Sequence, residues 1–128
     1  MFLFSKKTLK KKLGDFGENR AQAFLKKNGF EIIERNFRTN FGEIDIIAKK
    51  ENVFHFIEVK TRNQSTKLAP RCAVNNEKQR KITNTACIYL KKIKPTPHIS
   101  FDVIEVITDN ENNVTYINHI KNAFYSKR

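Results

Sequence analysis

Cysteine, glycine, proline and acidic residues are all scarce in this chain. Its 128 residues include 2 Cys, 4 Gly and 3 Pro, and only 13 acidic residues stand against 25 Lys and Arg. Cys72 and Cys87 have neither metal-site nor redox spacing, and one disulfide would be weak support for export, so we expect a reduced, cytoplasmic protein. No apolar run approaches the roughly 20 residues that span a bilayer. The apolar patch at residues 2–4 precedes its lysines, which is the reverse of a signal peptide.

What the chain does have is apolar residues and positive charge. Hydrophobic residues make up 39% of it, including 11 Phe. This is enough to bury the core of one domain and argues against wholesale disorder. The net charge of +12 points to a polyanionic partner, either nucleic acid or an anionic membrane face. Charge alone does not choose between these two partners.

The apolar periodicity predicts one α/β domain at residues 13–121, between a basic arm at residues 1–12 and a tail at residues 122–128. Helical spacing runs from residue 13 to residue 28, and Gly29 can end that helix. The other expected elements are strands at residues 30–37, 43–49, 53–61, 101–107 and 114–120, an exposed loop at residues 62–71, and a second helix from Asn75 or Asn76 to about Ile93. The second and third strands form a hairpin, and the second helix can return the chain across the sheet. We therefore expect a central mixed five-stranded sheet flanked by two helices.

A few of the scarce acids lie on strands, where surface charge explains them poorly. Because strand side chains alternate between faces, Glu43 and Asp45 are expected on one face of their strand, opposite Ile44 and Ile46. Glu58 lies on the neighbouring strand, where Lys60 shares its face. In a hairpin these acids can converge, and converging carboxylates raise at least one pKa unless a cation lies between them.

The chemistry that fits such a cluster is metal-assisted hydrolysis of phosphodiester bonds. Mg²⁺ prefers hard oxygen ligands and keeps several waters, and a nearby lysine can orient a water or stabilise charge on a phosphate. Taken singly, the Glu-x-Lys pair is also explained as a solvated surface pair, and the segment before Asp45 as an ordinary turn. The combination, with a further acid at Glu18 on the first helix, favours an active site.

Several motifs in this order are similar to those of a known family. They are Gly14-Asp15-Phe16-Gly17-Glu18, Asn36-Phe37-Arg38, Gly42-Glu43-Ile44-Asp45-Ile46-Ile47-Ala48, Phe56-Ile57-Glu58-Val59-Lys60-Thr61-Arg62, Lys78-Gln79-Arg80 and Phe101-Asp102-Val103. Through them the chain resembles the restriction-endonuclease-like superfamily with the PD-(D/E)xK signature. It more closely resembles the bacterial YraN-like family of uncharacterised predicted endonucleases, which is similar in fold to archaeal Holliday-junction resolvases.

The resemblance implies a restriction-endonuclease-like fold and a catalytic site that uses Mg²⁺ or Mn²⁺. Asp45 would be the central metal ligand, Glu58 the second, and Lys60 the lysine that helps the attacking water. Glu18 resembles the additional acid of the resolvase-like branch, as a catalytic residue and metal ligand, and Gln79 matches a polar position of the second helix. The family tends to carry a glycine before the proline near residues 67–70; this chain lacks it, so any loop-borne substrate contact can differ.

Basic residues close to the expected site are the candidates for binding phosphates, which dominate affinity for nucleic acid. They are Arg38, Arg62, Lys67, Arg71, Lys78, Arg80 and Lys81. The three histidines, His55, His98 and His119, lie on different elements without metal-ligand spacing, so we expect structural or surface roles for them. Asp102, inside a strand, is expected to be a buried partner of a basic residue.

The leading hypothesis is therefore a metal-dependent endonuclease that hydrolyses DNA, with branched or structured DNA among its candidate substrates. The alternative is a non-catalytic nucleic-acid-binding module that retains the nuclease fold. A membrane-surface protein is the weakest of the three hypotheses, and no membrane partner is expected. The analogy with resolvases, which cut two strands symmetrically, suggests a homodimer.

Overall fold

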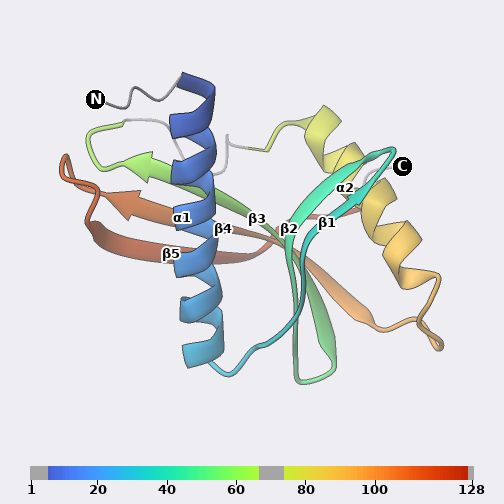
Figure 1. Cartoon of the computed structure of the whole chain (residues 1–128). Coiled ribbons are helices and arrows are strands. Elements are labelled where there is room, and N and C mark those ends of the chain that lie inside the picture. The colour runs from blue at the N-terminus through green and yellow to red at the C-terminus, as the bar shows by residue number, and fades with distance from the viewer. Residues whose placement is uncertain (1–5, 67–73, 127–128) are drawn as a thin grey trace.

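The computed structural model describes residues 6–66 and 74–126, and places one helix on each face of a central sheet (Figure 1). The elements are α1 (Lys6–Lys27), β1 (Glu31–Thr39), β2 (Gly42–Lys50), β3 (Val53–Asn63), α2 (Asn76–Leu90), β4 (His98–Thr108) and β5 (Val114–Phe124). The strands lie in sequence order across the sheet. Among the described strands only the β3–β4 pair is parallel, and α2 makes the crossover between these two strands. The predicted mixed five-stranded α/β sheet with two flanking helices is confirmed.

The first helix is longer than its apolar periodicity indicated. It begins at Lys6 rather than Leu13, so the lysines at residues 10–12 lie on the helix and not in a separate arm; residues 1–5 lie outside the described chain. Its end agrees with the prediction: Gly29 has φ 87, and the Phe30 backbone N donates to the Leu25 carbonyl at 3.0 Å. A glycine in the left-handed region closes the helix in this way at little steric cost.

Several boundaries after residue 60 also differ from the expectation: α2 ends at Leu90 rather than near Ile93, and β4 begins at His98 rather than at Phe101. β3 continues to Asn63, so the first residues of the expected loop are part of the sheet; residues 67–73 lie outside the described chain. β5 continues to Phe124, whose side chain is buried against Phe101 in a stacked pair of rings with centroids 5.0 Å apart. Burial of this one aromatic ring explains why the strand extends into the expected tail.

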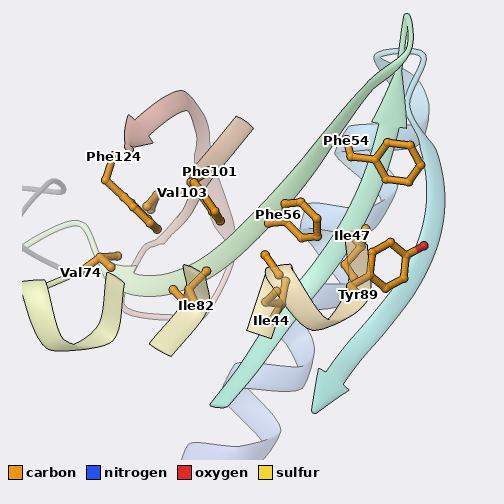
Figure 2. Close-up of a cluster of buried hydrophobic side chains, with 11 residues drawn as sticks. Ile44, Ile47, Phe54, Phe56, Val74, Ile82, Tyr89, Phe101, Val103 and Phe124 are labelled. Atoms are coloured by element: carbon orange, nitrogen blue, oxygen red, sulfur yellow. The ribbon is translucent and has the colours of Figure 1, made fainter. Parts of the chain in front are cut away.

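Each helix covers its own hydrophobic cluster. On the α1 face, Ala21 and Leu25 pack against strand residues that include Ile57 and Ile104. On the α2 face, Ile82 and Tyr89 are directed toward Ile44, Phe56 and the other apolar side chains of the sheet (Figure 2). In the described residues, no helix has the length and apolar character needed to cross a membrane.

The start of α2 is fixed by its own sequence. The Asn75 side chain accepts a hydrogen bond from the Lys78 backbone N at 2.9 Å, which confirms the predicted cap. Glu77 lies in the first turn, where its negative charge complements the helix dipole. Lys78, whose backbone N makes the cap bond, therefore lies in the first turn of α2.

Candidate active site

The candidate site lies where β2 and β3 separate. Their ladder runs from Lys50 paired with Val53 to Ile46 paired with Ile57 and stops there, although both strands continue. Beyond this point β2 stays paired with β1, and β3 with β4. The opening exposes backbone groups of β3 that a neighbouring strand would otherwise satisfy.

Asp45 fills part of this opening. Its Oδ2 accepts a hydrogen bond from the Val59 backbone N at 2.8 Å. The predicted strict alternation of β2 is wrong here, because Ile44 packs in the α2-side cluster while Ile46 packs in the α1-side cluster. Opposite this break on β1 lies Asn36, between the partners of Ile44 and Ile46, and its backbone has φ 53.

Glu58 lies on the β3 side of the opening and is only 7% exposed. Its Oε1 is 3.3 Å from Lys60 Nζ and 2.5 Å from Lys78 Nζ. Lys60 therefore lies beside Glu58, as the Glu-x-Lys spacing on one strand predicts. Lys78, which the sequence suggested only as a phosphate contact, is a direct neighbour of the carboxylate.

The pKa shifts in this group come first from burial and then from the charges that face one another. Burial, together with repulsion from Glu58, raises the pKa of Asp45 to about 8. Burial lowers the pKa of Lys60 despite its contact with Glu58. Burial also disfavours the charged form of Lys78, but the Glu58 carboxylate outweighs that effect and raises the pKa of Lys78. The site thus has fewer compensating positive charges near Asp45 than near Glu58.

Glu18 reaches the same region from α1. Its Oε1 is 3.3 Å from Arg35 Nη2, and burial raises the pKa of Glu18 although the guanidinium opposes this. With its amide nitrogen turned toward both acids, Asn36 donates to Glu18 Oε1 at 3.0 Å and to Glu43 Oε1 at 2.9 Å. Sequence patterns assigned no role to Arg35, and they indicated Asn36 only as part of the Asn36-Phe37-Arg38 motif. Asparagine tolerates the left-handed backbone found at Asn36 but does not require it.

A pocket of about 150 Å³ opens onto the two central carboxylates. It is lined by Gly42, Glu43, Asp45, Glu58, Lys78, Lys81 and Ile82. Such a volume accommodates an ion with several waters, since a water occupies about 30 Å³ in the liquid. Mg²⁺ is commonly held by one or two carboxylates plus waters. Asp45 and Glu58 fit this way of holding Mg²⁺. The raised pKa of Asp45 shows that its carboxylate lacks a compensating positive charge, which a bound ion would supply.

The other residues predicted for the site are placed less centrally. Gln79 donates from Nε2 to the Val74 carbonyl at 3.0 Å and so supports the start of α2. Arg62 pairs internally with Glu105, whose Oε2 is 3.0 Å from Arg62 Nε.

The remaining candidate phosphate contacts divide into surface residues and residues outside the described chain. Arg38 forms an exposed pair with Glu43 at 3.2 Å. Lys81 lies 3.6 Å from Glu77, and Arg80 is exposed on the same helix. Lys67 and Arg71 fall in residues 67–73, outside the described chain.

Two histidines that look unrelated in sequence meet on the opposite face of the sheet. His55 Nδ1 and His119 Nε2 each lie 2.6 Å from Asp102 Oδ2. The expectation of a buried Asp102 paired with a basic residue is confirmed. Burial alone would raise the pKa of Asp102, but hydrogen bonds from His119, His55 and Ser100 hold it below its ordinary range. Within residues 6–66 and 74–126, this is the one trio of His, Cys, Asp or Glu whose ligand atoms all lie within 4.8 Å of one another.

The family of the chain follows from sequence comparison. A model described as "Uncharacterised protein family UPF0102" matches residues 17–106, a span that includes Glu18, Asp45, Glu58 and Lys60. The chain belongs to the UPF0102 family. The YraN-like resemblance drawn from the motifs agrees with this membership.

UPF0102 proteins of several bacteria are similar over almost their whole length. One from Clostridium acetobutylicum is 45% identical over 117 residues, covering 91% of this chain and 96% of the relative. One from Clostridium botulinum strain 657 is 48% identical over 116 residues, covering 89% and 94%. One from Caldicellulosiruptor saccharolyticus is 45% identical over 116 residues, covering 90% and 98%. None of these UPF0102 names states an activity, so the chemistry must be argued from the site.

Proposed function

We propose that the chain is a metal-dependent endonuclease that hydrolyses phosphodiester bonds in DNA. The observation that carries the proposal is the pair of repelling carboxylates, Asp45 and Glu58, at the separation of β2 and β3 with Lys60 beside them. Neither solubility nor fold stability explains two adjacent acids of which one, Asp45, has its pKa raised to about 8 by burial and by repulsion from the other. A hydrolytic site explains both the acids and the lysine.

In this proposal Asp45 and Glu58 would hold Mg²⁺ or Mn²⁺, with Glu18 and Glu43 at the edge of the site. A bound ion of this kind polarises a phosphate oxygen and makes a coordinated water more acidic. Lys60 Nζ, whose pKa is lowered by burial, would hold the attacking water or stabilise charge on the phosphate. Val59 fixes the Asp45 carboxylate through its backbone N–H.

The surface next to the pocket suits a polyanion. Lys78, Lys81 and Arg80 lie on the first turns of α2, and Lys78 and Lys81 line the pocket itself. Since phosphate contacts dominate affinity for nucleic acid, a strand crossing this helix would bring a phosphate to the acids. Lys78 is 38% exposed and could exchange its contact with Glu58 for a phosphate oxygen.

The test is a cleavage assay on labelled linear and four-way-junction DNA with Mg²⁺, with Mn²⁺ and with EDTA. We expect metal-dependent products from the wild type, and a rate at least about 100-fold lower for Asp45→Asn and Lys60→Gln. Lys26→Gln, which removes an exposed lysine at the far end of α1, is the matched control and should cleave normally. Equal cleavage by the wild type and Asp45→Asn would exclude the proposed site.

A second function, binding without cleavage, is favoured by one specific contact. Lys78 Nζ, 2.5 Å from Glu58 Oε1, already supplies Glu58 with a positive charge. A binding module would keep this ion pair, would bind DNA in EDTA, and would lose affinity linearly on a log–log plot against salt. DNA binding that is unchanged by EDTA and by Asp45→Asn, with no products under any metal, would select this function.

A homodimer and the choice of DNA over RNA stay predictions. Sedimentation of the chain alone and with a four-way junction would test the first. Competition between DNA and RNA of the same sequence would test the second.

A further inference from the structure

The His55–Asp102–His119 trio is built from three adjacent strands, β3, β4 and β5. It is buried: Asp102 is 0% exposed, and the side chains of His55 and His119 are 9% and 7% exposed. Both imidazoles approach the same atom, Asp102 Oδ2, at 2.6 Å. Glu58 lies on the other face of β3, because side chains of a strand alternate between faces. The trio is thus separate from the candidate nuclease site.

The backbone of β5 is irregular at the point where the trio forms. The β4–β5 register shifts between Phe101 paired with Phe124 and Val103 paired with Ile120, which is a β-bulge opposite Asp102. Asn122, within the bulge, has φ 51. Bulges re-aim side chains, and non-glycine residues at positive φ are uncommon, so the sheet accepts a local cost where the trio is assembled.

The second oxygen of Asp102 is fixed by neighbours of the bulge. Ser100 Oγ donates to Asp102 Oδ1, and the Asn122 backbone N lies 3.3 Å from the same oxygen. Oδ1 is therefore held, and Oδ2 points at the two imidazoles. Outer hydrogen bonds of this kind orient the ligands of metal sites.

We propose that His55 Nδ1, His119 Nε2 and Asp102 Oδ2 form a binding site for a divalent transition-metal ion, with Zn²⁺ as the best fit. Two imidazoles and one carboxylate are a ligand set that Zn²⁺ uses when it keeps a further position for water or another ligand. All three ligand atoms lie within 4.8 Å of one another. Each imidazole would bind the ion in the neutral form whose proton lies on its other ring nitrogen, so that His55 Nδ1 and His119 Nε2 each offer a lone pair.

The surroundings supply an entry path and an apolar wall. A pocket of about 490 Å³ reaches His55 and Ser100 from the surface. Phe30 packs its ring against both histidines, with centroids 5.0 Å from His55 and 5.5 Å from His119. Lys50 also lines the pocket, and its positive charge would lower the affinity for a cation or attract an anionic ligand to it.

A purely structural hydrogen-bonded trio is the competing explanation. One imidazole would be enough to compensate one buried carboxylate, and Ser100 already satisfies the other oxygen. A carboxylate oxygen can accept two hydrogen bonds, so the two contacts alone fit either explanation. The metal site is favoured because three ligand atoms lie within 4.8 Å of one another and a pocket reaches His55.

Titration of the full chain with Co²⁺, followed by visible absorption and by displacement with Zn²⁺, tests the proposal. Cys72→Ser with Cys87→Ser removes thiolates that could bind either ion. We expect one tightly bound equivalent per chain at the trio, apart from any weaker binding at Asp45 and Glu58. His55→Asn and His119→Asn should each weaken binding by about 100-fold or more, and Ser100→Ala by about 10-fold.

Two controls keep the result specific. His98→Asn removes an exposed histidine from the rim of the same pocket and should leave the affinity unchanged. Asp45→Asn removes the other candidate metal site and should also leave it unchanged. Stoichiometric binding that does not respond to either trio variant, or no binding by the wild type, overturns the proposal.

X-ray absorption of the zinc-loaded wild type gives a readout that does not depend on any variant folding. A first shell of nitrogen and oxygen with the scattering pattern of two imidazoles supports the site. A shell without imidazole contradicts it.

Discussion

Asp45→Asn should make the chain more stable in the absence of divalent metal, and the gain should grow with pH. In the folded chain the pKa of Asp45 is raised from 3.8 to about 8 by burial and by Glu58. Between these two pH values the folded state holds a proton that the unfolded chain has lost. Stability of the wild type therefore falls as pH rises through this window. Asparagine does not titrate, so the variant lacks this fall, and its amide oxygen can still accept from the Val59 N–H.

The size of the effect follows from the shift. The difference between 3.8 and about 8, at 1.36 kcal/mol per pKa unit, sets a ceiling of about 6 kcal/mol above the folded-state pKa. Asp45 is only partly buried, so solvent screens part of this effect and the gain lies below the ceiling. We expect a gain of about 2 kcal/mol at pH 8 and well under half of that at pH 5.

Urea unfolding at pH 5 and pH 8 in EDTA measures this gain for Asp45→Asn against the wild type. Glu31→Gln removes an exposed carboxylate from β1 and is the matched control, with no pH-dependent gain expected. Addition of Mg²⁺ should stabilise the wild type and not the Asn variant, which reduces the difference between them. If Asp45→Asn is less stable than the wild type at both pH values, the carboxylates do not repel as described and the electrostatic argument for the site fails.

Three further substitutions test the packing that holds the site. Gly17→Ala would put a Cβ 1.8 Å from Thr61 Oγ1, so thermal unfolding should show a loss of about 1–3 kcal/mol that Thr61→Ala relieves. Gly14→Ala on the same helix meets nothing within 4 Å and should instead add about 0.5–1 kcal/mol; the same sign for both glycines would contradict the close approach of α1 to β3. Arg62→Met leaves Glu105, 2% exposed, without its guanidinium, and urea unfolding should show a loss of about 3 kcal/mol; an unchanged midpoint would mean that this ion pair does not support β3.

The arrangement of strands and helices could be predicted because its signals are local. Asn75 caps α2 and Gly29 ends α1 as their types indicate, and the long apolar periods gave the element order. The predicted ends of strands were wrong where a contact with a residue distant in sequence determines the end. β5 reaches Phe124 because that ring stacks on Phe101, and no local pattern reports such a contact.

Within the candidate site, the motif residues were easier to predict than their neighbours. Glu58 and Lys60 share a strand, so their proximity is a matter of spacing. Lys78 approaches Glu58 only because α2 packs across β2 and β3, which is a tertiary fact. The trio around Asp102 was invisible for the same reason: its histidines are 64 positions apart, from His55 to His119, and a bulge brings them together.

The central claim is that Asp45 and Glu58 hold a divalent ion, and a Mn²⁺-soaked crystal tests it most directly. The account predicts an anomalous peak roughly 2.1–2.3 Å from a carboxylate oxygen of each residue, with Lys78 Nζ displaced from Glu58. A crystal that takes up no Mn²⁺ at this position, with Lys78 still paired to Glu58, would contradict it.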